Sequence, residues 1–164
     1  MVAELESVFN VEGFSLDLDF EMDLSDVSIN NVHPFKSPVK VRGKIYNRAA
    51  VVHFSAVASF LFDIPCDRCL APVKKECAVP VEHILVTQLN DDKNDEFTLI
   101  DSYSFDLEPL VCEDIFLSFP TNFLCKDDCK GLCPVCGKNL NDGPCGCKKS
   151  IDPRLAVLEQ LLEE

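Results

Sequence analysis

The sequence has no apolar run close to the roughly 20 residues that a membrane-spanning helix needs. Its longest apolar stretch is AVVHFSAVASFLF, residues 50–62. The first residues, MVAELESVFNVEG, also lack the basic start and the apolar stretch of a secretory signal. The sequence therefore predicts a cytoplasmic protein that has no membrane partner and whose thiols are kept reduced.

Motifs of the common enzyme classes are missing as well. The sequence contains no H-E-x-x-H, G-x-S-x-G, Walker A or G-x-G-x-x-G motif. A catalytic zinc usually takes histidine ligands and keeps one coordination position open, but His33, His53 and His83 lie far in sequence from the closely spaced cysteines of residues 125–147. The sequence thus predicts a protein that is not an enzyme, and no small-molecule substrate is expected.

Basic residues are scarce: 15 Lys and Arg stand against 28 Asp and Glu, which gives a formal net charge of -13. This charge repels phosphate and disfavours non-specific binding to nucleic acid. Acids are themselves absent from residues 27–62, where the chain is locally basic. The simplest interpretation of this basic stretch is a solvated strand edge. Direct contact with RNA would have to use that stretch and cationic residues further along, namely Lys36, Lys40, Arg42, Lys44, Arg48 and Arg68, with Lys74 and Lys75.

Alternating apolar and polar residues predict strands in the first two thirds of the chain. The stretches FSLDLDFEMDL, PVKVRGKIYN, AVVHFSAVASFLFDIP, ECAVPVEHILVTQL and FTLI all have extended character. A turn is expected at Asn47–Arg48, between the second and the third of these strands.

Helical spacing begins at Asp106 and stops at Pro120, and a second helix is expected from Asp152, which would be its N-cap. The predicted fold is α+β, with a largely antiparallel sheet, a few helices and a cysteine-rich zinc-binding C-terminal segment. A strand-rich core ending in a helix would cover residues 1–124. The zinc-binding segment and a C-terminal helix packed on that core would cover residues 125–164.

Ten cysteines are present, and in a reducing compartment they are more often metal ligands or core residues than disulfides. The strongest motif is C-P-V-C-G, Cys133 to Gly137, because two thiolates with two residues between them can reach one metal from a tight turn. The nearby C-G-C, Cys145 and Cys147, supplies the second pair that a tetrahedral zinc requires. We predict one zinc site made of Cys133, Cys136, Cys145 and Cys147.

Two further pairs have spacings compatible with a second metal. They are Cys66–Cys69 and Cys125–Cys129, and together they would staple a turn of the sheet to the start of the cysteine-rich segment. One metal with six candidate ligands remains an alternative, as do an iron site and redox chemistry of the thiols. The spacings favour zinc, as one or two structural ions. Cys77 and Cys112 have no close partner and are expected to pack in the core.

Three motifs resemble those of a known family. The C-x-R-C-L element of Cys66 to Leu70, the G-L-C-P-x-C-G-x-N-L-N element of Gly131 to Asn141 and the D-P-R-L element of Asp152 to Leu155 are similar to elements of the YceD-like family, the large ribosomal RNA subunit accumulation proteins of bacteria and plastids. The resemblance extends from about Val8 to the end of the chain. It implies a role in the synthesis, processing or stability of large-subunit ribosomal RNA, without a known reaction.

The expected function is therefore that of a ribosome-biogenesis factor acting as a zinc-stabilised binding protein. The net charge of -13 favours a basic ribosomal protein or an rRNA-processing factor as its partner, and large-subunit rRNA itself is a second candidate. Two other classes stay open. A zinc-dependent enzyme would need an open coordination position at the metal, and a redox or metal-responsive protein would need accessible thiols.

Overall fold

The computed structural model describes residues 1–88 and 97–147. The described chain is mostly β-structure, with two short α-helices and one turn of 3-10 helix. No helix in this part of the chain is both long and apolar enough to cross a membrane. The elements in chain order are β1 (Val2–Glu4), α1 (Glu6–Asn10), β2 (Ser15–Met22), β3 (Val39–Arg48), β4 (Val51–Pro65), β5 (Pro72–Val86), β6 (Phe97–Leu99), β7 (Ser104–Asp106), α2 (Glu108–Leu117) and the 3-10 turn η1 (Leu140–Asp142).

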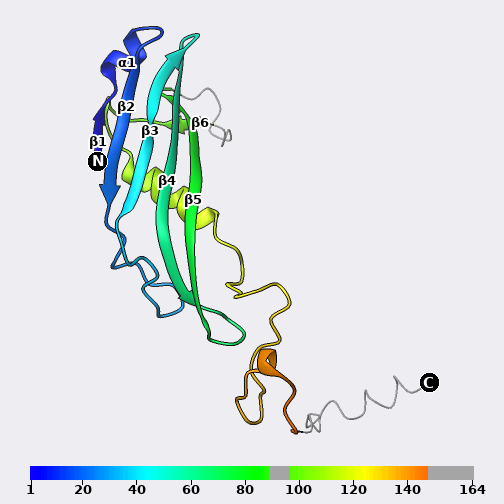
Figure 1. Cartoon of the computed structure of the whole chain (residues 1–164). Helices are drawn as coiled ribbons and strands as arrows, with labels where there is room; N and C mark the ends of the chain where they lie inside the picture. Colours follow the sequence, from blue (N-terminus) through cyan, green and yellow to red (C-terminus); the bar gives the residue numbers. More distant parts are fainter. Residues whose placement is uncertain (89–96, 148–164) are drawn as a thin grey trace, which may run out of the picture.

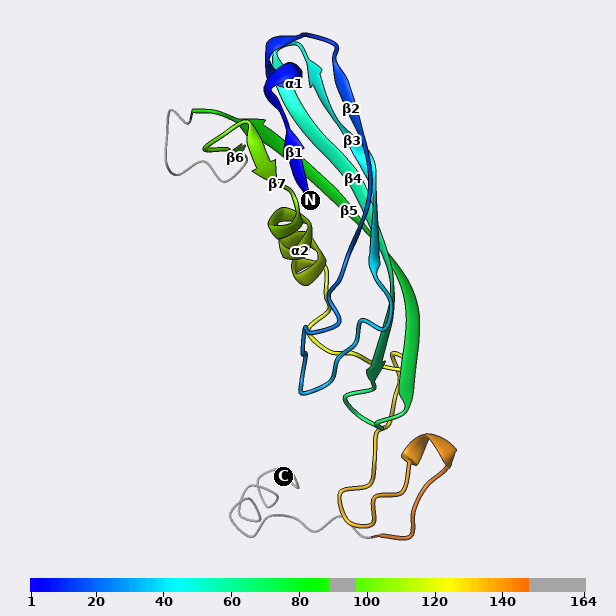
Figure 2. The same cartoon turned by 90° about the vertical axis from the view of Figure 1, so that its left-hand side faces the viewer.

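Five strands form one curled sheet in the order β2-β3-β4-β5-β6 (Figure 1). Strand β1 pairs with β7 in a separate ribbon (Figure 2). Neighbours from β2 to β5 are antiparallel, but β6 runs parallel to β5, with Ile84 opposite Phe97. The α+β class agrees with the prediction, whereas the sheet is mixed rather than largely antiparallel. Tight turns enforce antiparallel pairing, but residues 87–96 form a longer connection, and strand alternation alone does not reveal the direction of the strand that follows it.

The predicted turn at Asn47–Arg48 is wrong by two residues. Both residues belong to β3, and the chain reverses at Ala49 and Ala50, whose φ angles are 53° and 61°. A two-residue hairpin loop of this kind needs positive φ at both positions and usually carries Asn or Gly there. Alanine rarely adopts that conformation, so the sequence holds no signal for the true position of the turn.

The sheet has one covered face and one open face. In β4 every second side chain from Val52 to Ile64 is buried, and the side chains between them are half-buried or exposed. The covered face meets α2 and the β1–β7 ribbon, which lie on the same side of the sheet (Figure 2). Helix α2 contributes Val111 and Ile115 to this core.

An aromatic cluster extends the core toward the β4–β5 turn. Phe35, from the segment between β2 and β3, lies 5.3 Å from Phe60 and 5.7 Å from Phe62, measured between ring centroids. Phe119 and Phe123, which follow α2, lie 4.8 Å and 5.2 Å from Phe62. The cluster fixes the chain that leaves α2 onto β4, and so directs the chain toward the far end of the sheet.

Residues 125–147, called here the cysteine-rich end, lie beyond the β4–β5 turn at one end of the molecule (Figure 1). The buried side chains of this segment are those of Cys129 and Cys133. The domain boundary at residue 125 stays a prediction, and the helix expected from Asp152 lies outside the described residues.

Candidate metal centres

The first group of cysteines joins two distant parts of the sequence. The sulfur atoms of Cys66, Cys69, Cys125 and Cys129, called here the Cys66 group, all lie within 4.8 Å of one another. Two come from the β4–β5 turn and two from the start of the cysteine-rich end. The Sγ atoms of Cys66 and Cys129 are 3.8 Å apart, and those of Cys69 and Cys125 are 3.5 Å apart. The structure therefore brings the four residues together in the combination that the sequence predicts.

The β4–β5 turn aims its two cysteines inward. The N–H of Cys66 donates to the carbonyl of Ala71 at 2.8 Å, and the N–H of Leu70 donates to the carbonyl of Cys66 at 2.9 Å. Leu70 closes the turn with a φ of 59°. Cys66 and Cys69 are 0% and 6% exposed as a result.

Arg68 fastens this turn to the cysteine-rich end, and Asp67 fastens it to the chain just before that end. The Arg68 guanidinium donates to the carbonyl of Cys129 at 2.9 Å, and the carbonyl of Arg68 accepts from the N–H of Leu132 at 3.1 Å. The Asp67 carboxylate accepts from the N–H of Phe123 at 2.7 Å. Arg68 thus has a structural contact at this group; a contact with RNA stays a prediction.

The second group is more local and more open. The sulfur atoms of Cys133, Cys136, Cys145 and Cys147, called here the Cys133 group, also lie within 4.8 Å of one another. The N–H of Gly137 donates to the carbonyl of Cys133 at 2.9 Å, and Gly137 has a φ of 72°, a conformation that glycine adopts without strain. Cys133 is buried and Cys136 is exposed. Because the two groups share no residue, the geometry supports two sites of four sulfurs and not one metal with six candidate ligands.

The four thiols of the Cys66 group differ in acidity. Burial acts to raise the pKa of Cys66, but hydrogen bonds from surrounding backbone amides outweigh it and lower the pKa to about 6. Hydrogen bonding with Cys69 raises the pKa of Cys125 to about 12. Adjacent thiolates repel one another, so the group cannot become fully ionised at neutral pH without added positive charge.

The Cys133 group shows the same division. Hydrogen bonds from the backbone amides of Cys136 and Val135 lower the pKa of Cys133 to about 6. Hydrogen bonding with Cys136 raises the pKa of Cys147 to about 12. In each group, one thiol ionises readily and another does so only beside a cation.

Both groups fit a thiophilic metal ion. Four sulfur donors match the tetrahedral Cys₄ sites of zinc and of iron, whereas Mg²⁺ and Ca²⁺ select oxygen ligands. A bound divalent ion would supply the missing positive charge and displace the thiol protons. The donor set is thus compatible with metal binding at both ends of the cysteine-rich segment, and zinc in particular stays a prediction.

One contact in the Cys66 group was not predicted from the sequence. The side-chain amide of Asn141 donates from Nδ2 to Sγ of Cys129 at 3.3 Å. This hydrogen bond is the main reason why the pKa of Cys129 is lowered. A signal for this residue was present, because Asn141 ends the G-L-C-P-x-C-G-x-N-L-N element, but sequence spacing does not indicate which sulfur it contacts.

The histidines lie away from both groups, as expected. His83 joins three elements, because its Nε2 is 3.0 Å from Oδ2 of Asp114 on α2 and its Nδ1 is 3.2 Å from Oγ1 of Thr98 on β6. His53 stacks on Tyr46 at 5.2 Å, and Nδ1 of His33 is 3.1 Å from a backbone carbonyl. Cys77 and Cys112 are half-buried and pack against the core.

The basic side chains of β3 lie on the open face of the sheet, beside the acidic strand β2. The sheet register places Lys40, Arg42 and Lys44 of β3 directly opposite carboxylates of β2. The Lys40 ammonium is 3.8 Å from the Glu21 carboxylate, and the Arg42 guanidinium is 3.2 Å from that of Asp19. Much of the positive charge that RNA contact would need is therefore balanced within the sheet.

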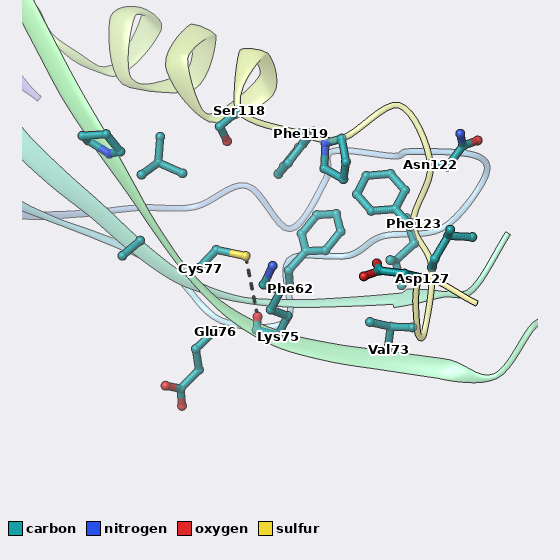
Figure 3. Close-up of a pocket in the computed structure, with 16 residues that line it drawn as sticks. Phe62, Val73, Lys75, Glu76, Cys77, Ser118, Phe119, Asn122, Phe123 and Asp127 are labelled. Atoms are coloured by element: carbon teal, nitrogen blue, oxygen red, sulfur yellow. Dashed lines mark hydrogen bonds between the residues drawn. The ribbon is translucent and has the colours of Figure 1, made fainter. Parts of the chain in front are cut away.

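A groove lies on the other side, between β5 and the chain that follows α2. It has a volume of about 480 Å³. Figure 3 shows the rings of Phe62, Phe119 and Phe123 around it, with Cys77 on β5 and Asp127 at the cysteine-rich end. Its apolar walls can accept aliphatic or aromatic side chains of a partner.

Comparison with known proteins agrees with the motifs. The family model of the large ribosomal RNA subunit accumulation protein YceD matches residues 55–162, which include most of β4, all of β5 and α2, and both cysteine groups. YlbN of Bacillus subtilis is 29% identical over 154 residues, covering 92% of this chain and 90% of YlbN. Rv2926c of Mycobacterium tuberculosis and Mb2951c of Mycobacterium bovis are each 34% identical over 103 residues, 59% of this chain and 49% of theirs.

The chain thus matches about half the length of these mycobacterial relatives. No solved structure matches it. Because the family model covers well over half of the sequence, the chain belongs to the YceD family, named for large ribosomal RNA subunit accumulation.

Proposed function

We propose that this protein supports the accumulation of large-subunit ribosomal RNA as a binding factor whose cysteine-rich end is stabilised by two zinc ions. The family assignment is the observation that carries the proposal. The two four-cysteine groups explain how a segment with hardly any apolar core could present a defined surface.

A structural role for the metals is favoured over a catalytic one. A zinc ion held by four protein sulfurs has no coordination position left for water or substrate. A redox role is disfavoured at Cys66 and Cys69, because both side chains are almost fully buried and a redox-sensing thiol needs access to its oxidant. We therefore propose that the protein binds and does not catalyse.

A basic protein is the partner that the charges favour. The net charge of -13 would steer a cationic partner toward this chain, while the basic row of β3 is partly neutralised by Glu21 and Asp19. The groove beside Phe119 and Phe123 could hold the apolar side chains of such a partner. A basic ribosomal protein or an rRNA-processing factor has the matching charge.

The test compares protein and RNA ligands under the same conditions. Zinc-loaded protein is titrated with purified basic proteins of the large ribosomal subunit and, separately, with large-subunit rRNA, at several salt concentrations. We expect saturable binding to a basic protein and weaker binding to rRNA. Tight rRNA binding whose log–log salt slope is about -0.7 to -0.9 per phosphate contact would instead indicate direct contact with RNA.

A matched pair of variants identifies the surface. Lys40→Gln removes one cation from the open face, whereas the double change Lys40→Gln with Glu21→Gln removes the pair and keeps the net charge. Direct RNA contact predicts that both variants lose rRNA affinity. In cells, depletion of the protein should lower large-subunit rRNA relative to small-subunit rRNA, and an unchanged ratio would contradict the proposed function.

A further inference from the structure

The loop that carries the Cys133 group reaches into the Cys66 group. Asn141 lies between Cys136 and Cys145 in sequence, yet its Nδ2 donates to Sγ of Cys129 at 3.3 Å. Cys129 is 2% exposed, so this hydrogen bond is shielded from water. A sulfur of the Cys66 group therefore accepts a hydrogen bond from the loop that joins the two cysteine pairs of the Cys133 group.

The Asn141 side chain has a defined orientation. Its Oδ1 accepts from the N–H of Lys130 at 3.0 Å, and its Nδ2 also donates to Oδ1 of Asn139 at 2.9 Å. The N–H of Leu140 donates to the carbonyl of Gly131 at 2.9 Å. These contacts set the loop against the chain that joins the two groups, and they direct the amide nitrogen toward Cys129.

The loop between Cys136 and Cys145 has no buried side chain. Residues 137–144 are exposed or half-buried throughout, so hydrogen bonds and the two cysteine pairs hold the loop more than apolar packing does. Their two ends are the cysteine pairs on either side. A metal that links Cys133 and Cys136 to Cys145 and Cys147 would close the loop and remove most of its chain entropy. Asn141 would then already be positioned beside Cys129 when a metal enters the Cys66 group.

We infer that Asn141 couples the two sites, so that metal in the Cys133 group strengthens metal binding in the Cys66 group. This inference rests on the proposed zinc binding. Outer hydrogen bonds to metal ligands typically change metal affinity by about 10- to 100-fold. Because linkage between binding sites is reciprocal, metal in the Cys66 group strengthens the Cys133 group by the same factor.

The experiment is a four-protein cycle on the full chain: wild type, Cys133→Ser, Asn141→Ala and the double variant. Each is titrated with zinc against a competing chelator. Occupancy is assigned by alkylating metal-free thiols and identifying the modified cysteines by mass spectrometry. We expect Cys133→Ser and Asn141→Ala each to weaken the Cys66 group by about 10- to 100-fold, and the double variant to weaken it no further.

Two controls keep the result interpretable. Asp142→Ala changes an exposed neighbour in the same loop and should leave both affinities unchanged. Asn141→Asp keeps the shape of the side chain but removes its N–H donors, and should weaken the Cys66 group at least as much as Asn141→Ala, whether or not the alanine variant folds well.

The outcomes separate this inference from the proposed function. Suppose that the wild type binds two zinc ions and that Asn141→Ala and Asn141→Asp leave the zinc affinity of the Cys66 group unchanged. This result would overturn the coupling but not the proposed function. Additive losses in the double variant would also overturn the coupling, because independent contributions need no shared contact. A wild type that binds no zinc would overturn both.

Discussion

The sheet and the cysteine-rich end contrast in what holds each of them. In β4 alternate side chains from Val52 to Ile64 are buried in a hydrophobic core that also contains Val111 and Ile115 of α2. In residues 125–147 the buried side chains are two cysteines, and the turns have exposed apolar residues such as Val135. Burial of apolar surface can order the first region, whereas the second needs ligand bonds. The molecule therefore has two sources of stability, which different treatments should remove separately.

Metal removal should have the largest effect and should be confined to one region. Structural zinc contributes about 10–16 kcal/mol to the folding of small metal-dependent segments. A strong chelator should therefore make the backbone amides of residues 125–147 exchange faster than in the zinc-loaded protein, while those of β3 and β4 stay protected. Hydrogen exchange read by mass spectrometry, region by region, measures both.

Readdition of zinc is the control for irreversible damage to the thiols. If the backbone amides of the sheet lost their protection from exchange together with those of the cysteine-rich end, the two regions would form one cooperative unit. They would then not have separate sources of stability.

Removal of a buried aromatic ring should destabilise the sheet and leave the cysteine-rich end unaffected. Phe35 is 2% exposed and contacts Phe60, Phe62 and Phe119. Phe35→Ala should lower the free energy of unfolding of the sheet by about 3–5 kcal/mol, as measured by urea denaturation. Zinc content per chain should not change.

Phe116→Ala is the matched control, because Phe116 is 41% exposed at the end of α2. It should have an effect well under that of Phe35→Ala. Equal losses in the two variants would mean that burial does not determine the stability of the sheet.

The same contrast explains what the sequence could predict. Strands β2, β4 and β5 follow from period-two alternation, because one face of the sheet is buried and the other is solvated. The grouping of cysteines follows from their spacing, because two close thiolates on one turn need a second pair to complete a tetrahedral site.

The features that the sequence did not predict depend on contacts between residues far apart in the chain. The parallel pairing of β6 with β5 joins two strands that no tight turn connects, and no local pattern in the sequence records the direction of such a pairing. The bond from Asn141 to Cys129 depends on the fold of the loop between two cysteine pairs. The pairing of Lys40 with Glu21 depends on the register of β2 against β3, although each strand was predicted by itself.

Arg68 tests the junction between the two regions. Its guanidinium donates to the carbonyl of Cys129 at 2.9 Å, and a single hydrogen bond of this kind contributes about 1 kcal/mol. Arg68→Ala should therefore speed the release of zinc from the Cys66 group several-fold, as measured with a chromophoric chelator. Arg68→Lys should be intermediate, because an ammonium keeps the charge but lacks the planar set of donors.

Lys126→Ala is a suitable control, since its ammonium is exposed and lies 3.7 Å from the carboxylate of Asp128. If Arg68→Ala released zinc at an unchanged rate, Arg68 would have no structural role at the Cys66 group. Contact with RNA or with a protein partner would then be the better explanation for the presence of Arg68.

The last expected effect is a pH dependence of the metal-free protein. The pKa of Cys66 and that of Cys133 are lowered from 9.0 to about 6 by backbone amides. Their contribution to the stability of the metal-free cysteine-rich end is therefore complete above pH 9.0, declines as the pH falls, and is lost below about 6. The pKa values of Cys125 and Cys147 are raised to about 12, so their contribution is complete below pH 9.0 and is lost as the pH rises toward 12.

Thiolate absorbance in the ultraviolet should accordingly show a first step near pH 6 in the native metal-free protein and a single step near 9.0 in denaturant. Cys66→Ser and Cys133→Ser should each make that first step smaller, since each cysteine belongs to a different group. Cys112→Ser should leave it intact, because burial raises the pKa of Cys112. A native titration centred near 9.0 would mean that the backbone of the two turns is not preorganised for anionic sulfur, and metal would then have to shape the cysteine-rich end as well as hold it.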